Sequence, residues 1–189
     1  TIQARQAIVL IAHERGFWSD PYRISAEGTF YFPAVAIDPQ GKVWIAWSEY
    51  ANGRWSVRVR FWDRGALGTT EEASDASPVN LQPAIAALPS GEIYVAWQAA
   101  AGGRFDIRGR SRRNGAWSPA ETISRGGTHE FRPALAVDSS GLLWAAWDRA
   151  DGSGYQAIVR YRGEKGWAAE AAAFSPREDT RVPQVAADP

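Results

Sequence analysis

The sequence has no cysteine and no methionine, and only two histidines among its 189 residues. Without cysteine, this stretch of chain forms no disulfide, offers no thiolate to a metal and has no cysteine nucleophile. The histidines, His13 and His129, fall in different classes of predicted loop, so we do not expect them to share a metal ion. We therefore expect neither a metal nor a cofactor. Position 1 holds threonine, and we expect this end to be cut or processed.

The chain also lacks an excess of charge of either sign and any long apolar run. Lys plus Arg and Asp plus Glu are each 21, so the formal net charge is +0, and no overall basic field favours nucleic acid. No stretch approaches the roughly 18 apolar residues that a membrane-spanning helix needs. No segment has helical periodicity, which excludes a phosphate-binding loop at a helix N-terminus. We expect no nucleic-acid partner and no membrane span.

What the sequence does contain is a repeat. Residues 33–47 read Pro-Ala-Val-Ala-Ile-Asp-Pro-Gln-Gly-Lys-Val-Trp-Ile-Ala-Trp, and residues 83–97 and 133–147 follow the same pattern. A fourth copy begins at Pro183. The spacing of 50 residues between copies is typical of propellers and other repeat architectures.

Each repeat predicts four short strands and no helix. In the first repeat, residues 34–37 and 43–47 are apolar runs separated by a turn with Gly41, as in strands buried on both faces. Residues 55–61 alternate apolar and polar side chains, which is typical of a half-exposed strand, and a further glycine turn precedes a fourth strand. Four strands with apolar inner members are typical of a β-propeller blade. We expect the tryptophan that ends the second strand to pack between blades, at Trp47, Trp97 and Trp147.

The repeat predicts one all-β propeller domain of four-stranded antiparallel blades, with partial blades at its two ends. Residues 6–9 match residues 156–159, so the beginning of the chain corresponds to the second half of a blade. We expect a ring that is incomplete within this sequence, as in a segment of a larger propeller; the alternative is two chains that join into one ring. Open blade edges would favour self-association. The predicted units are the back half of a blade at 1–29, full blades at 30–79, 80–129 and 130–179, and the first strand of a further blade at 180–189.

The whole unit reads Pro-Ala-x-Ala-x-Asp-x-x-Gly-x-Val-Trp-x-Ala-Trp, followed by an arginine-rich strand and Gly-x-Trp-Ser-x-Pro. It resembles the repeats of the sialidase-like, Asp-box (BNR) propellers. In that family the turn between strands three and four reads Ser-x-Asp-x-Gly-x-Thr-Trp. The corresponding turns here, at residues 61–67, 111–117 and 164–167, keep the glycine but not the full motif. The resemblance implies a secreted or envelope protein, extracellular or periplasmic.

One short motif within the resemblance concerns catalysis. Sialidases carry Phe-Arg-Ile-Pro, in which the arginine binds the substrate carboxylate, and Phe131-Arg132-Pro133 is similar to a shortened version. A guanidinium suits a carboxylate because it donates two parallel hydrogen bonds. The alternative is that position 132 is only the residue before the repeat proline, which is Phe32 and Gln82 in the earlier copies. The remainder of a sialidase site has no assignable residues here.

Ligands of propellers usually lie at one end of the ring, on the loops that enter strand one and leave strand two. An aromatic ring, amides and charges at these positions would suit a polar ligand such as a sugar, although each residue could equally be a solvated loop residue. The arginines of strand three are expected to form a solvated outer face, paired with acidic neighbours; they are Arg58, Arg60, Arg108 and Arg110. The candidate binding residues are Tyr31, Gln82, His129, Glu130, Arg132 and Asp148.

Intact repeats without a catalytic constellation favour a non-catalytic module that binds a polysaccharide or a protein partner. The alternatives are a sialidase-like glycoside hydrolase with its active site partly outside this chain, and a purely structural scaffold. Fold alone does not choose among them, because propellers host many functions.

Overall fold

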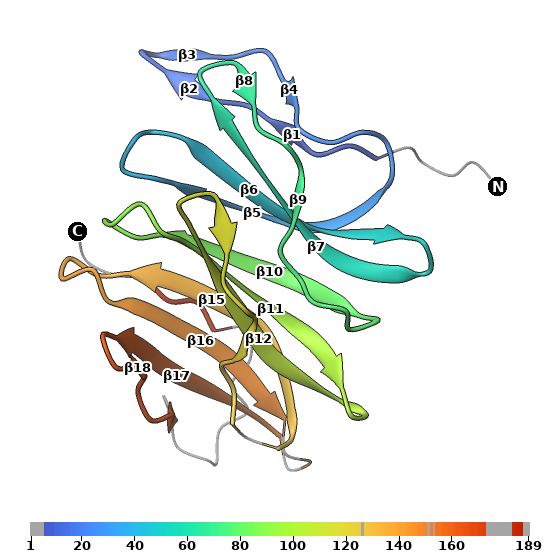
Figure 1. The fold of residues 1–189 in the computed structure, drawn as a ribbon, viewed down its shortest axis with the longest axis vertical. Coiled ribbons are helices and arrows are strands. Elements are labelled where there is room, and N and C mark those ends of the chain that lie inside the picture. Colours follow the sequence, from blue (N-terminus) through green and yellow to red (C-terminus); the bar gives the residue numbers. More distant parts are fainter. Residues whose placement is uncertain (1–5, 126, 151, 153, 173–182, 187–189) are drawn as a thin grey trace.

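In the computed structural model of this chain, each full repeat forms one antiparallel sheet. The structure describes residues 6–125, 127–150, 152, 154–172 and 183–186. Three sheets of five strands follow two small sheets of two strands along the chain, from blue to orange in Figure 1. The prediction of an all-β chain with four-stranded antiparallel sheets is confirmed. The two shortest strands of each five-stranded sheet pair with the same neighbouring strand and together form the fourth strand. Closure of these sheets into a ring stays a prediction.

The strands of the three full sheets correspond to one another at the repeat spacing. The first sheet contains β5 (Thr29–Ile37), β6 (Val43–Ala51), β7 (Arg54–Asp63), β8 (Ala66–Leu67) and β9 (Glu71–Glu72). The second contains β10 (Asn80–Ala87), β11 (Ile93–Ala101), β12 (Arg104–Arg113), β13 (Ala116–Trp117) and β14 (Glu121–Thr122). The third contains β15 (His129–Val137), β16 (Leu143–Ala150), β17 (Tyr155–Gly163), β18 (Gly166–Trp167) and β19 (Ala171–Ala172).

The fourth strand of each sheet is interrupted. Both β8 and β9 pair with β7, β8 at Trp62 and Asp63 and β9 at Arg58 and Val59. The N-terminal segment has the same arrangement in smaller form: β1 (Val9–Leu10) pairs with β4 (Tyr22–Arg23), and β2 (His13–Glu14) pairs with β3 (Phe17–Trp18). The pairing in this segment resembles that of strands three and four in a full sheet.

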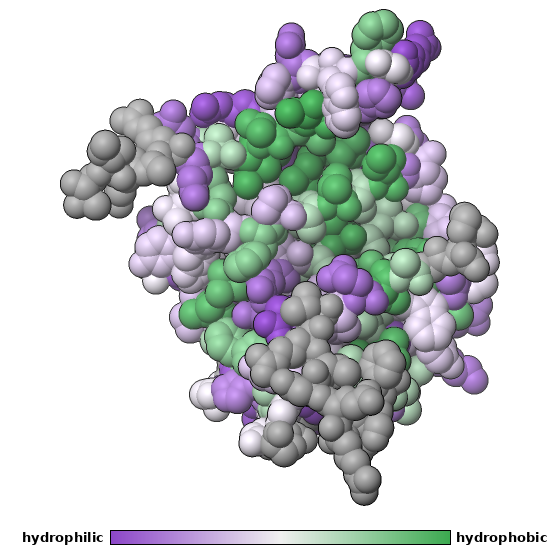
Figure 2. Space-filling view, turned by 180° about the vertical axis from the view of Figure 1, so that it is seen from behind, coloured by the Kyte–Doolittle hydropathy of each residue, from purple (hydrophilic) through white to green (hydrophobic). Residues whose placement is uncertain are grey.

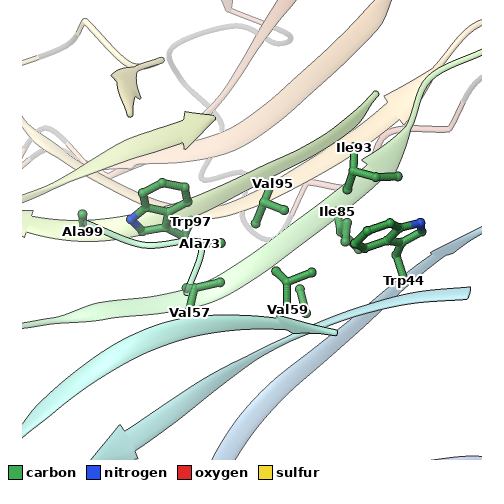
Figure 3. Close-up of a cluster of buried hydrophobic side chains, with 10 residues drawn as sticks. Trp44, Val57, Val59, Ala73, Ile85, Ile93, Val95, Trp97 and Ala99 are labelled. Carbon is green, nitrogen blue, oxygen red and sulfur yellow. The ribbon is translucent and has the colours of Figure 1, made fainter. Parts of the chain in front are cut away.

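The core lies between neighbouring sheets. Figure 3 shows one such cluster, in which Trp97 and Val95 of the second sheet face Val57, Val59 and other residues of the first sheet. Trp147 occupies the next cluster and Trp47 the one toward the N-terminal segment. All three indoles are at most 1% exposed, so the predicted packing of these tryptophans between sheets is confirmed. Burial of each stabilises the fold by up to about 5 kcal/mol.

The turn after strand one is held by the aspartate of the repeat. Asp38 accepts hydrogen bonds from the backbone N–H groups of Gln40 and Lys42 and from the indole of Trp44. Asp138 accepts the equivalent bonds in the third sheet, and the hydrogen bonds from Ser140 and the Trp144 indole lower the pKa of Asp138 to about 2. The aspartate carboxylate therefore stabilises the turn in both sheets.

Arginines at the repeat spacing join neighbouring sheets. Arg60 donates to the carbonyl of Ile24 at 2.5 Å and Arg110 to that of Glu72 at 2.6 Å, in each case across to the preceding sheet. Arg160, which is 2% exposed, donates in the same way to the carbonyl of Ile123. Thus Arg60 and Arg110 are not part of a solvated outer face, because strand three passes close to the outer strand of the preceding sheet.

The arginines two residues earlier form ordinary ion pairs. Arg58 pairs with Glu72 at 3.1 Å and Arg108 with Asp75 at 2.9 Å. Since these side chains are partly exposed, each pair contributes little to stability.

Candidate binding surface

Strand one of each full sheet contains a β-bulge just before the repeat proline. In the first sheet Tyr31 pairs with Ser48 and Ala34 with Ala46, so two residues, Phe32 and Pro33, lie opposite Trp47. The same shift occurs in β10 and β15. The bulge residue has a positive φ in each sheet: 54° at Phe32, 52° at Gln82 and 54° at Arg132.

This backbone conformation is uncommon for residues other than glycine and costs about 1 kcal/mol or more. It persists with three different side chains, so the surrounding repeat must hold it. The freed N–H of Gln82 donates to the hydroxyl of Ser48 at 3.1 Å, and that of Arg132 to the amide oxygen of Gln98 at 3.2 Å. In both cases the acceptor belongs to the preceding sheet and directly follows its buried tryptophan.

The three bulge residues form a row at one end of the sheets. Strand β10 packs between β5 and β15 (Figure 1), so equivalent positions on these strands are neighbours. We call Phe32, Gln82 and Arg132 the bulge row. Phe32 is 46% exposed, and the other two are half-buried. One strained backbone position thus presents an aromatic, an amide and a guanidinium side by side.

Exposed aromatic rings continue the bulge row on the first sheet. The ring of Tyr31 lies 5.9 Å from that of Phe32 and 5.5 Å from that of Trp55. The ring of Tyr50 lies 5.2 Å from that of Trp55. Tyr31 is 48% exposed and Tyr50 47%. We call Tyr31, Phe32, Tyr50 and Trp55 the aromatic patch.

A second group of rings lies at the same end of the third sheet. Phe131 contacts Phe105 of the second sheet at 5.6 Å between ring centroids and stacks on His129 at 5.7 Å. Tyr155 lies 6.4 Å from Phe131, and the guanidinium of Arg132 lies 5.7 Å from the Tyr155 ring. Arg132 is thereby held between an aromatic face and its acidic partner.

That partner is Asp148, which is fully buried. The Nε of Arg132 donates to Asp148 Oδ2 at 2.5 Å, while its Nη2 is buried without a hydrogen-bond partner in the described part of the chain. The positive charge of the Arg132 guanidinium, which a ligand carboxylate would approach, is therefore already compensated by the buried Asp148.

Glu130 also lies inside the protein. It is fully buried and accepts hydrogen bonds from the indole of Trp147 and from Arg149 Nε, the latter at 2.8 Å. Burial raises the pKa of Glu130, and these two donors act in the opposite direction. Asn80 has the same place in the second sheet, where it accepts from the indole of Trp97 at 2.9 Å.

The structure brings four of the six predicted residues to the accessible end of the sheets and turns the other two inward. Tyr31 and His129 are exposed, Gln82 and Arg132 are half-buried, and Glu130 and Asp148 support neighbouring side chains. His13 lies in β2 of the N-terminal segment, where its ring centroid is 4.8 Å from that of Trp18. Sequence reasoning missed Phe32, Tyr50 and Trp55. The recurrence of an aromatic residue at positions 55, 105 and 155 was the signal for the last of these.

Among the residues that the structure describes, no group of three or more His, Cys, Asp or Glu side chains is arranged to hold a metal ion. No described helix is long and apolar enough to cross a membrane.

Comparison with known proteins supports the fold. No family model and no curated protein matches the chain, so the resemblance to Asp-box propellers stays a prediction. A protein of unknown function from Dyadobacter fermentans has a similar structure, with a TM-score of 0.59 and 12% identity over 74% of this chain. The present chain covers 53% of that protein, about half its length.

Two further structures are more distantly similar. A fucose lectin from Kordia zhangzhouensis matches with a TM-score of 0.47 and 15% identity, over 76% of this chain and 99% of the lectin. An α-L-arabinanase from Penicillium chrysogenum matches with a TM-score of 0.38 and 12% identity, over 80% and 68%. The geometry shows a chain of repeated antiparallel sheets, and the similarity to the Dyadobacter fermentans protein supports this fold.

Proposed function

We propose that this chain is a non-catalytic binding module of a secreted or envelope protein, and that the aromatic patch and bulge row together bind a glycan. The observation that carries the proposal is the aromatic patch itself. Three of its rings, those of Tyr31, Phe32 and Tyr50, are each nearly half exposed. Tyr31 and Tyr50 both lie against Trp55, and Phe32 lies against Tyr31. A large apolar group on a soluble surface usually marks a binding site. The C–H face of a sugar ring packs on such rings, because aromatic faces carry partial negative charge.

The neighbouring polar side chains supply the hydrogen bonds that a glycan needs. Gln82 and Arg132 follow Phe32 along the bulge row, and His129 lies beside Phe131 on the third sheet. Ligand sites combine an apolar wall with a few positioned polar groups in this way. The backbone beneath these side chains is held by Ser48 and Gln98, so the surface is organised before a ligand arrives.

The buried carboxylates favour binding over hydrolysis. Most glycoside hydrolases other than sialidases need two carboxyl groups facing the scissile bond, whereas Glu130 and Asp148 are buried and hydrogen-bonded to Trp147, Arg149 and Arg132. Arg132 is the residue on which the sialidase-like alternative depends.

The test is a glycan array followed by calorimetric titration of the best oligosaccharide. Tyr31→Ala and Phe32→Ala should each weaken binding about fivefold or more, since each removes a stacking surface worth about 1 kcal/mol. Tyr161→Ala is a matched control, because Tyr161 is 41% exposed and lies 5.3 Å from Trp144, a pairing like that of Tyr31 and Trp55. It should bind as the parent protein does.

Two outcomes would overturn the proposal. One is an array without binding, or binding that Tyr31→Ala and Phe32→Ala leave unchanged. The other is cleavage of fluorogenic glycosides that Arg132→Ala abolishes, which would establish the hydrolase alternative.

A further inference from the structure

A cleft of about 410 Å³ lies between the N-terminal segment and the first full sheet. Figure 1 shows β2 and β3 beside β8 at this point. The cleft lies at the turns between strands three and four, away from the bulge row in strand one. Its lining residues are Ala12, Phe17, Trp18, Ser19, Tyr22, Trp62 and Arg64.

The walls of the cleft are aromatic and unusually exposed. Phe17 is 79% exposed and Trp18 73%, the two largest values among the described large apolar residues. Tyr22 lies 5.1 Å from Trp62 behind them. A single exposed aromatic residue needs no explanation, but adjacent ones around a hollow indicate a binding site. Apolar side chains also gather on the face turned away from the viewer in Figure 1, which Figure 2 shows in green.

The uncommitted polar groups of the cleft are hydrogen-bond donors. Trp62 is 6% exposed, and its indole nitrogen is buried without a partner in the described part of the chain. Arg64 is exposed at the tip of the turn after β7. The hydroxyl of Ser19, by contrast, is engaged, because it accepts from the N–H of Ala12 and donates to the carbonyl of Asp20.

The equivalent groove between the first and second sheets contains its own carboxylate. Glu71 accepts two hydrogen bonds from Arg112, both at 2.7 Å, and one from the indole of Trp117 at 2.8 Å. Arg112 occupies the position that Trp62 has in the first sheet, and Trp117 the position of Leu67, at the repeat spacing.

The groove between the second and third sheets follows the same rule. Glu121 lies 3.9 Å from Arg162, and the buried Glu92 accepts from Arg162 at 2.8 Å and from Arg113. In the cleft beside the N-terminal segment, the position of Glu71 and Glu121 is Pro21, and none of the lining residues is acidic. Among the described residues that line the cleft, the donors therefore face no glutamate like Glu71 or Glu121.

We propose that this cleft binds an acidic saccharide of the uronic acid class. The sugar ring lies on Trp18, and its carboxylate takes the place that Glu71 and Glu121 have in the other grooves, where it accepts hydrogen bonds from Arg64 and the Trp62 indole. The Trp62 indole nitrogen is buried, so the carboxylate reaches it only after the hairpin β2–β3 moves aside. Only two residue pairs join these two strands in the described part of the chain, which favours such a movement. The volume is sufficient for one or two sugar rings.

The experiment is a tryptophan-fluorescence and NMR titration with oligogalacturonate, in parallel with the same oligosaccharide after reduction of its carboxyl groups. The acidic form should bind, and the reduced form should bind at least about tenfold more weakly, because charge-assisted hydrogen bonds are lost. Arg64→Gln removes the surface charge, and Trp62→Phe removes the indole N–H while keeping a ring. Each should weaken binding about tenfold.

Trp167→Phe and Arg104→Gln are the controls, since both residues lie outside the cleft, and they should bind normally. Equal binding of the acidic and reduced forms, normal binding by both cleft variants, or no binding of oligogalacturonate would each overturn the proposal. Tyr31→Ala should leave this titration unchanged, so the cleft and the aromatic patch succeed or fail separately.

Discussion

The buried tryptophans of strand two and the bulge row of strand one both recur with the same backbone in each full sheet, but only the tryptophans keep the same side chain. Trp47, Trp97 and Trp147 are alike in every full copy and are buried between sheets. The bulge row has equally constant dihedral angles, but its side chains are phenylalanine, glutamine and arginine. The constant residues therefore stabilise the packing of the sheets, whereas the proposed binding surface depends on residues that vary on a constant backbone.

Trp97→Ala should have the largest effect on stability. Trp97 is fully buried between the first and second sheets, and its indole donates to Asn80 at 2.9 Å. Loss of the ring and of this bond should lower the free energy of unfolding by about 3–5 kcal/mol. Urea denaturation followed by circular dichroism measures this change. Tyr31→Ala, on the exposed end, should differ from the parent by less than about 1 kcal/mol.

Arg160→Gln should come next. The Arg160 guanidinium is buried and donates to the carbonyls of Ala168, Trp167 and Ile123. Its loss should destabilise by roughly 2–3 kcal/mol, because buried carbonyls lose a charged donor. Arg58→Gln is the comparison, since that partly exposed ion pair contributes about 0–1 kcal/mol. Equal effects of the two substitutions in thermal denaturation would contradict the role of Arg160 between sheets.

Gly109→Val tests whether constancy of the repeat is always stabilising. Positions 59 and 159 are valine in the other sheets. A Cβ at Gly109, however, would lie 2.7 Å from Tyr94 Oη and 2.9 Å from Ile123 Cδ1. We expect Gly109→Val to destabilise by about 1–3 kcal/mol through overpacking. A higher melting temperature would mean that the repeat pattern outweighs the local contacts.

Phe32→Gly should have the smallest effect on stability. Glycine relieves the positive φ of 54°, so the free energy of unfolding should rise, by less than about 1 kcal/mol. Tyr31→Gly is the matched control at a position without positive φ and should lower it by a similar amount. Denaturant midpoints measure both changes. Destabilisation by Phe32→Gly equal to that of Tyr31→Gly would argue against strain at the bulge.

Much of the fold could be predicted because its signals are local. The apolar runs, the turn glycine and the tryptophan of strand two lie within fifteen consecutive residues, 33–47. The candidate surface was predicted only in part. Glu130 and Asp148 were read as surface residues because polar side chains beside a loop are usually solvated, whereas neighbouring residues enclose both.

The sequence by itself determined the antiparallel sheets, their spacing and the burial of the repeat tryptophans, since hydrophobic pattern and turn chemistry act over a few residues. Only the tertiary structure decided which side chains join the sheets and which remain free. Ser48 binds the N–H of Gln82, 34 residues away, and Arg160 binds the carbonyl of Ile123, 37 residues away. Such partners meet only when whole sheets pack together. The same packing leaves Trp18 and Arg64 beside a cleft whose counterparts contain a glutamate.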